Sequence, residues 1–232
     1  MFKTFKRFSR YVLGIRNDTD FYSQGGEDAI VWNTFAYMTS IRSGSYLDIG
    51  AYHPFKHSNT YLLYKAGWKG FNIDPRPGSK ALFDRYRKRD INIEAGVAAE
   101  DGTMTYYIVG ESSTMNTFSK ENLERLGLID EVIRTVEVPV YSLASLSKKW
   151  PGAGEVNYLN IDAEGFEMEI LRGLPEVSRL PEVISLEQNN VTTLKDVLES
   201  EPCSFLAELD YVPYAKNIIL QRVATVFYIR ES

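Results

Sequence analysis

The chain has 232 residues, of which 44% are hydrophobic and 25% are charged, so it can bury one sizeable core. Its single cysteine, Cys203, excludes an intramolecular disulfide, and one cysteine with two histidines cannot form a Cys/His zinc site. No apolar run approaches the roughly 18 residues of a membrane span, and the start lacks a signal peptide's apolar stretch. We therefore expect a soluble, cytoplasmic protein.

Charge is distributed unevenly along the chain. The net charge is −5, but residues 1–16 contain five basic residues and no acid, which leaves −10 for residues 17–232. So acidic a body argues against a nucleic-acid substrate. Aromatic and aliphatic residues recur at helical spacing through the basic segment, which predicts a helix that either lies on an anionic membrane or a partner, or packs on the domain. The basic residues are Lys3, Lys6, Arg7, Arg10 and Arg16, and the apolar stripe is Phe2, Phe5, Phe8 and Val12. We expect this segment to precede a single domain, residues 17–232.

The first part of that domain alternates between helical and β-rich segments. We expect a helix over residues 26–40, a strand over 45–50, a helix from Ser58 and Asn59 to Ala66 and a strand over 70–74. A helix over 78–88 and a strand over 91–97 follow. The order βαβαβ is typical of the first half of a doubly wound α/β sheet.

The ends of the first two strands predict a nucleoside site. The first apolar run ends in a turn at Gly50, and the second ends at Asp74, 24 positions later. A carboxylate at such a strand end can accept hydrogen bonds from both hydroxyls of an adenosine ribose. The turn has one glycine instead of three, so it lacks an evident pyrophosphate cradle. This favours a cofactor with a ribose but no phosphate, such as S-adenosylmethionine.

The middle of the chain departs from this alternation. Two β-rich runs, 103–109 and 135–141, enclose a polar stretch over 111–117 and a short helix over 120–127, and a helix over 142–149 follows. The polar stretch lacks periodicity and predicts a mobile loop. Residues 112–117 could cover a pocket as a lid, or the insertion could brace the edge of the sheet.

Acidic residues cluster after two later strands. The run 156–161 leads into Asp162 and Glu164, and the run 181–186 leads into Glu187 and Asn189. Neighbouring parallel strands would bring Asp162, Glu187 and Asn189 to one point. Such oxygen atoms suit Mg²⁺ or Ca²⁺, and a single unpaired carboxylate would suit a general base. The alternative is that the acids only cap the helix that follows the first run.

In sequence, these motifs together resemble the FkbM-type family of S-adenosylmethionine-dependent methyltransferases. The resemblance covers about residues 22–190 and rests on YSQGGED (22–28), YLDIGAYHP (46–54), SNTY (58–61), GWKG (67–70), NIDP (72–75), LNIDAEGFE (159–167) and ISLE (184–187). It implies a class I methyltransferase fold, a Rossmann-like three-layer α/β sandwich with a seven-stranded, mostly parallel sheet and an antiparallel last strand. The runs 209–214 and 224–229 agree with a closing β-hairpin.

The resemblance also implies roles for individual residues. Asp48, Gly50, Ala51 and Tyr52 would form the loop under the methionine part, and Asp74 would hold the ribose. Pro75, Gly96 and Val97 would border the adenine, while Gln24, Glu27 and Asn59 would complete the cofactor site. Without the resemblance, Asp48 could be a satisfied strand-end acid and Asp74 a helix cap.

The expected reaction is methyl transfer to a hydroxyl, whose proton must leave. His53, Asp162 and Glu187 are the candidate catalytic residues, and Asp162, Glu187 and Asn189 resemble the Mg²⁺ ligands of small-molecule O-methyltransferases, with glutamate where those enzymes have aspartate. The resemblance implies O-methylation of a sugar, polysaccharide or secondary metabolite. The alternatives are a nicotinamide-dependent sugar oxidoreductase, which should show a fuller glycine fingerprint, and a non-catalytic nucleotide-binding module.

Overall fold

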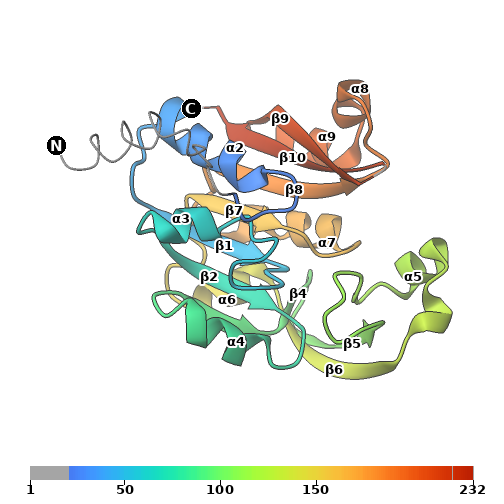
Figure 1. Ribbon diagram of the computed structural model, residues 1–232. Helices are drawn as coiled ribbons and strands as arrows, with labels where there is room; N and C mark the ends of the chain where they lie inside the picture. The colour runs from blue at the N-terminus through green and yellow to red at the C-terminus, as the bar shows by residue number, and fades with distance from the viewer. Residues whose placement is uncertain (1–20, 221, 232) are drawn as a thin grey trace, which may run out of the picture.

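Seven strands form the central sheet of the computed structural model, which describes residues 21–220 and 222–231 (Figure 1). In sheet order they are β3 (Ile91–Glu94), β2 (Lys69–Asp74), β1 (Ser45–Ile49), β7 (Tyr158–Ile161), β8 (Val183–Asn189), β10 (Val223–Arg230) and β9 (Tyr211–Leu220). All pairs from β3 to β8 are parallel, and β10 runs antiparallel to both β8 and β9. This confirms the predicted fold class, including the antiparallel last strand and the closing hairpin.

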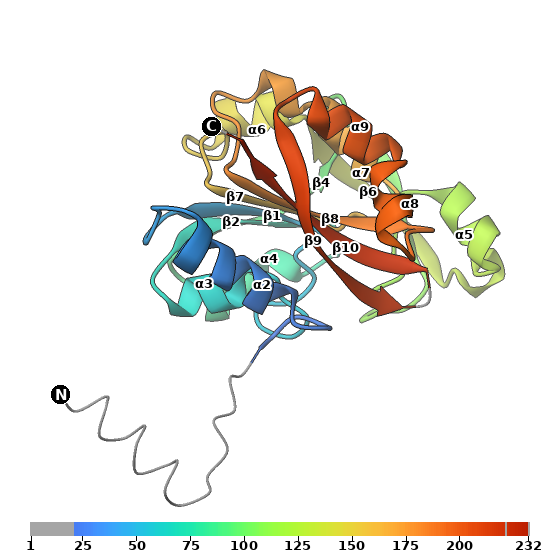
Figure 2. The ribbon, with the colours of Figure 1, turned by 90° about the horizontal axis from the view of Figure 1, so that it is seen from above.

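Helices cover both faces of this sheet (Figure 2). One face carries α2 (Glu27–Asn33), the π-helix η1 (Thr34–Met38), α3 (Tyr61–Lys65) and α4 (Ser79–Tyr86). The other carries α6 (Leu143–Lys149), α7 (Glu167–Arg172), η3 (Leu174–Glu176), α8 (Leu194–Leu198) and α9 (Glu201–Ala207). None of the helices in the described part of the chain has the length and apolar character needed to cross a membrane.

Successive residues of each central strand belong to different cores, because strand side chains alternate between the two faces. On β1, Tyr46 packs with Phe35 and Leu63 under α2, η1 and α3, whereas Leu47 belongs to the larger core that also contains Leu146 and Leu171. Both faces of the strand are therefore buried. This explains why the strands read in sequence as nearly continuous apolar runs.

A second, three-stranded sheet extends from one side of the molecule. It consists of β4 (Gly96–Val97), β6 (Arg134–Tyr141) and β5 (Gly102–Ile108), in that order, with α5 (Lys120–Leu126) and the 3-10 helix η2 (Ile129–Glu131) in the β5–β6 connection. The predicted single strand over 91–97 is therefore divided between two sheets. After Glu94 the chain leaves β2, and Gly96 pairs instead with Val140 of β6.

The remaining sequence predictions agree closely with the helices. The expected helix over 26–40 is α2 followed by η1. The helix expected from Ser58 and Asn59 begins later, at Tyr61 with Thr60 as its N-cap, although the Ser58 hydroxyl accepts a hydrogen bond from the N–H of Tyr61 at 3.1 Å. The basic segment over residues 1–16 lies outside the described residues, so its predicted helix stays a prediction.

Candidate active site

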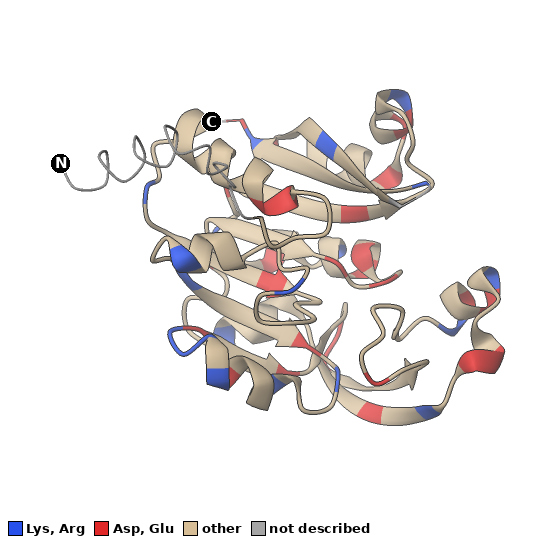
Figure 3. Ribbon diagram, viewed as in Figure 1, with Lys and Arg blue, Asp and Glu red and all other residues tan. Residues whose placement is uncertain are grey.

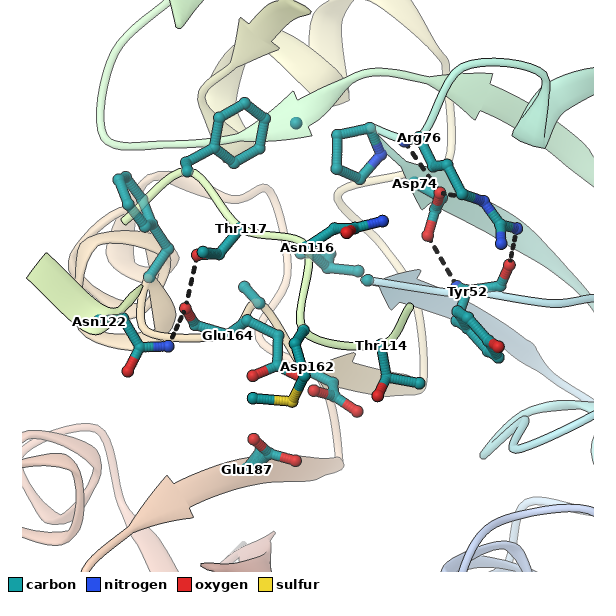
Figure 4. A pocket seen from close by; sticks show the side chains of 18 of the residues that line it. Tyr52, Asp74, Arg76, Thr114, Asn116, Thr117, Asn122, Asp162, Glu164 and Glu187 are labelled. Atoms are coloured by element: carbon teal, nitrogen blue, oxygen red, sulfur yellow. Dashed lines mark hydrogen bonds and ion pairs between the residues drawn. The ribbon is translucent and has the colours of Figure 1, made fainter. Parts of the chain in front are cut away.

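A cavity of about 420 Å³ opens where β1, β2, β7 and β8 end (Figure 4). Its lining includes Gly50, Asp74, Asp162 and Glu187, each at or just beyond the carboxyl end of one of these strands. This is the edge at which open α/β sheets bind ligands. The volume falls in the range typical of small-molecule sites.

Gly50 allows the ends of β1 and β7 to approach each other. Its φ is 77°, and a Cβ atom there would lie 1.6 Å from the carbonyl oxygen of Asp162. The N–H groups of Gly50 and Ala51 both donate to the carbonyl oxygen of Ile73, at 3.0 and 3.1 Å, which closes the turn against β2. Any side chain at position 50 would therefore push apart the strand ends that form the floor of the cavity.

Asp74 lines this cavity, and two backbone N–H groups hold its carboxylate in place. Its carboxylate accepts hydrogen bonds from the N–H of Tyr52 at 2.8 Å and of Arg76 at 3.0 Å, and the Arg76 guanidinium is 3.9 Å away. Burial raises the pKa of Asp74 to about 6, although Arg76 opposes that shift. Carboxylate oxygens have lone pairs beyond those used by these donors, so Asp74 can still accept from a ligand.

Asp48 does not line the cavity, although the sequence predicted it as a cofactor ligand. It accepts hydrogen bonds from the Thr60 hydroxyl at 2.6 Å and from the Asn160 amide at 2.8 Å. The Asn160 oxygen in turn accepts from the side chain of Asn59 at 3.1 Å, and Asn59 does line the cavity. Asp48 is thus placed to orient Asn59 through Asn160. Ala51 is buried and is also absent from the lining.

Gln24 and Glu27, the predicted cofactor contacts before β1, both line the cavity. Glu27 is buried, and its two carboxylate oxygens accept from the N–H of Gly25 at 2.9 Å and from the side chain of Asn217 at 2.7 Å. Because Asn217 belongs to β9, these contacts tie the start of α2 to the closing hairpin.

An apolar end of the cavity lies between the two sheets. The predicted residues Pro75, Gly96 and Val97 line it, together with Phe118, which the sequence analysis did not identify. A Cβ atom on Gly96 would lie 2.6 Å from the Phe118 ring, so the ring packs directly over the glycine. The position of Phe118, directly after the polar stretch 111–117, was the sequence feature that could have identified it.

Three carboxylates meet on another side of the cavity (Figure 4). Oxygen atoms of Asp162, Glu164 and Glu187 all lie within 4.8 Å of one another. The sequence predicted Asp162 and Glu187 together with Asn189; Glu164 joins the two acids, and Asn189 lines the same cavity. In the part of the chain that the structure describes, no lysine or arginine forms an ion pair with any of the three.

The surroundings of these acids favour their protonated forms. Burial is the main cause, followed by repulsion between the carboxylates. Together they raise the pKa of Asp162 and of Glu164 well above the ordinary values, and they raise the pKa of Glu187 to about 8. A hydrogen bond between Asp162 and Glu187 opposes part of the shift at Glu187.

The two histidines occupy different places. His53, a predicted catalytic residue, does not line the main cavity; it lines a separate hollow behind Tyr52, and its Nδ1 accepts from the N–H groups of Phe55 and Lys56 at 3.4 and 3.1 Å. His57, which was not predicted, lines the main cavity and stacks on Tyr52 with ring centroids 6.0 Å apart. Its buried Nδ1 has no hydrogen-bond partner within the described residues.

The polar stretch crosses the cavity as a covering loop, with residues 113–117 in the lining (Figure 4). Asn116 fixes its shape: the side chain accepts from the N–H of Val109 at 2.9 Å and donates to the carbonyl oxygen of Gly110 at 2.9 Å. The Thr117 hydroxyl donates to the carbonyl oxygen of Glu164 at 2.8 Å. The loop is therefore joined to the segment that carries the acids.

A family model described as "Methyltransferase FkbM domain" matches residues 48–213 of the chain. No curated protein matches the sequence significantly.

Solved structures of similar fold are distant in sequence. A structure titled "Putative hemolysin", from Streptococcus thermophilus, has a TM-score of 0.51 and 10% identity over 93% of this chain and 69% of that one, which supports the fold alone. The 1,6-didemethyltoxoflavin-N1-methyltransferase of Burkholderia thailandensis, solved with S-adenosylhomocysteine, has a TM-score of 0.48 and 11% identity over 98% of this chain and 86% of that one. A TehB-like SAM-dependent methyltransferase from Corynebacterium glutamicum has a TM-score of 0.45 and 8% identity, over 99% and 97% of the two chains.

Proposed function

Because this chain belongs to the family of FkbM methyltransferase domains, we propose that it transfers a methyl group from S-adenosylmethionine to a hydroxyl of a sugar, polysaccharide or secondary metabolite. The observation that carries the proposal is one cavity with Asp74 on one side and, on another, three carboxylates that form no ion pair with a described residue. The first can bind a ribose, and the second can take a proton from an acceptor.

The cofactor half of the cavity suits S-adenosylmethionine in three parts. Asp74 accepts the ribose hydroxyls, and the apolar end formed by Pro75, Val97 and Phe118 takes the adenine. The methionine part lies over the Gly50 turn, where Gln24 and Asn59 offer side-chain amides. One glycine turn without a pyrophosphate cradle agrees with a cofactor that has no phosphate.

The acid half then receives the acceptor. The bond between the methyl carbon and the sulfonium sulfur breaks as a carbon–oxygen bond forms, and the hydroxyl proton passes to a carboxylate of the Asp162–Glu187 pair. The products are S-adenosylhomocysteine, the methyl ether and a protonated carboxyl group. A base whose pKa lies near the working pH combines availability with proton affinity, and the pKa of about 8 at Glu187 meets that condition.

A divalent cation is compatible with the same acids, because Mg²⁺ prefers carboxylate oxygens. Asp162, Glu164 and Glu187 would hold it, and it would lower the pKa of the acceptor hydroxyl. Asn189 lines the same cavity, and its predicted participation as a ligand stays a prediction.

Isothermal titration of S-adenosylmethionine, S-adenosylhomocysteine and NADH into the protein, with and without Mg²⁺, tests the cofactor. We expect the first two to bind and NADH not to bind. Binding of NADH alone would favour the nicotinamide-dependent alternative. Binding of the sulfur ligands without methyl transfer to any hydroxyl in a broad panel of sugars and metabolites would favour the non-catalytic module.

Residues 1–16 carry a separate part of the proposal. Their five basic residues and apolar stripe would attach the enzyme to an anionic membrane that presents a glycan acceptor. Cosedimentation with anionic liposomes should decrease when residues 1–16 are deleted. Unchanged cosedimentation would overturn the membrane role and leave the methyl-transfer proposal intact.

A further inference from the structure

A second hollow lies beside the cofactor cavity, on the far side of Tyr52. Tyr52 and Arg76 line both spaces, while His53, Lys56 and Ser112 line only the second. The hollow is bounded by the turn after β1, by the residues before α4 and by the start of the covering loop. Tyr52 and Arg76 also contact Asp74, but the proposed methyl transfer uses no side chain of His53, Lys56 or Ser112.

His53 is fixed there as a hydrogen-bond donor. Its Nδ1 accepts backbone N–H groups, most closely that of Lys56 at 3.1 Å, so Nδ1 must carry a lone pair. The neutral ring therefore holds its proton on Nε2. Burial and then the charge of Arg76 lower the pKa of His53, which keeps the ring in this neutral form.

Lys56 and Arg76 are the cationic residues among the described lining of the hollow, and Arg76 also lies 3.9 Å from the Asp74 carboxylate. The Arg76 guanidinium donates to the carbonyl oxygen of Tyr52 at 2.5 Å and lies 5.1 Å from the centre of the Tyr52 ring, so its position is defined. Lys56 is exposed and forms no ion pair with another described residue. Glu111 is the one acid among the described lining residues, and it is already paired with Arg134 through contacts of 3.0 and 3.1 Å.

Aromatic surface continues from this basic lining. Phe55 packs edge-to-face on His53 with centroids 4.5 Å apart, and it also meets Tyr86 at 5.5 Å. Phe55 is 38% exposed and Tyr86 43% exposed. A charged group with an attached ring can therefore place its charge among the cations and its ring against these side chains.

We propose that the hollow formed by His53, Lys56 and Arg76 is an anion subsite that binds a phosphate or diphosphate group. The site is independent of the methyl donor, so this proposal goes beyond the methyl transfer and does not depend on it. The anion is either part of a phosphorylated acceptor that extends over Tyr52 into the main cavity or a free phosphate compound.

Titration of inorganic pyrophosphate into the full chain without cofactor, at 150 mM salt, tests the site directly. We expect saturable one-site binding that weakens about tenfold in Lys56→Ala, since charge-assisted hydrogen bonds contribute strongly to binding. Lys148→Ala is the matched control, because Lys148 is an exposed lysine on α6, and it should bind pyrophosphate like the wild type.

His53→Asn separates anion binding from the structure of the turn. The Asn Oδ1 can replace Nδ1 as the acceptor of the Lys56 N–H, while the Nε2 donor is lost. We expect this variant to keep the wild-type unfolding temperature and S-adenosylhomocysteine affinity but to bind pyrophosphate several-fold more weakly. No pyrophosphate binding to the wild type, or wild-type binding by both His53→Asn and Lys56→Ala, would overturn the proposal.

A second probe identifies the source of the anion. A nucleoside diphosphate sugar that binds more tightly than pyrophosphate, and loses that advantage in Phe55→Ala, would support a phosphorylated acceptor. Equal binding of both probes would support a free phosphate compound. Displacement of pyrophosphate by S-adenosylhomocysteine would instead place the anion inside the cofactor cavity and overturn the separate subsite.

Discussion

The acids on the two sides of the cavity have opposite surroundings. On the cofactor side, Asp74 accepts hydrogen bonds from two backbone N–H groups beside Arg76, and Asp48, which lies outside the cavity lining, accepts from Thr60 and Asn160. On the other side, three carboxylates lie within 4.8 Å of one another without a basic partner in the described part of the chain. Hydrogen bonds already hold the acids of the cofactor side in place without a ligand. The ionised carboxylates of the acid side repel one another until a proton or a ligand reduces their charge.

The two sides of the cavity differ in the charged groups that surround their acids. Negative charges are distributed in Figure 3 over the body of the molecule, but few of the acids are buried. Burial raises the pKa of Asp74 to about 6 and that of Glu187 to about 8. Arg76 and two backbone N–H groups oppose the rise at Asp74, whereas neighbouring carboxylates add to it at Glu187. An acid whose pKa lies near 8 is poised to exchange a proton at neutral pH, which is a property of catalytic groups. We therefore expect changes on the acid side to affect turnover and changes on the cofactor side to affect binding.

The largest expected effect comes from Glu187→Gln. Gln cannot accept the proton that the acceptor hydroxyl loses, so kcat should fall by about 10²- to 10⁴-fold. Titration should show S-adenosylhomocysteine affinity within about twofold of the wild type, because the cofactor side is unchanged. Glu199→Gln, which alters an exposed acid 3.6 Å from Lys195, is the control and should retain full activity. Wild-type kcat in Glu187→Gln would remove this residue from the mechanism.

Asp74→Asn should produce the complementary result. The amide keeps the size of the side chain but loses the charge that strengthens hydrogen bonds from the ribose. We expect S-adenosylhomocysteine to bind about 10- to 100-fold more weakly, since a hydrogen bond to a charged group is worth about 1.5–3 kcal/mol. Asp84→Asn, at an exposed acid of α4 that pairs with Lys80, is the matched control. Equal affinities in both variants would mean that Asp74 does not contact the cofactor.

Stability provides a third test of the comparison. Between pH about 4.5 and 8 the unfolded chain has lost the Glu187 proton while the folded protein retains it, so the free energy of unfolding decreases as pH rises through this window. Gln does not ionise, so the free energy of unfolding of the variant does not include this decrease. Glu187→Gln should therefore be more stable than the wild type by about 2 kcal/mol at pH 8.5, a value reduced for partial solvent access.

The pH series distinguishes this cause from simple repacking. Urea unfolding should show the advantage of Glu187→Gln shrinking towards zero at pH 4.5. An advantage of the same size at every pH would mean that the substitution acts through packing, and no advantage at pH 8.5 would contradict the proposed repulsion among the acids.

Sequence patterns predicted the sheet and the strand ends well because both follow from local rules. Apolar runs bounded by glycines and polar residues locate strands, and parallel strands must place their ends at one edge. Gly50, Asp74, Asp162 and Glu187 therefore converge as expected. Glu164 was harder to place, because its φ of 50° is left-handed and its carbonyl oxygen accepts hydrogen bonds from the distant residues Thr117 and Asn122.

The residues that sequence misplaced depend on side-chain direction. Asp48 precedes the glycine turn, but strand alternation turns it into the protein towards Thr60 and away from the cavity. His53 and His57 lie in one loop, and only its folded path decides which ring lines the main cavity. The separation of Gly96 from β3 depends on pairing with β6, which lies more than 35 residues later.

A smaller effect should appear in the pH dependence of cofactor binding. The pKa of Asp74 is about 6, and ribose hydroxyls donate to its ionised form, so S-adenosylhomocysteine should bind with constant affinity above pH 7 and about tenfold more weakly at pH 5. Titrations across this range in the wild type and in Asp74→Asn measure the contribution, because the variant should lose the step near pH 6. If Asp74→Asn keeps the same pH dependence, another acid causes the change in affinity, and the charge of Asp74 does not contribute to binding.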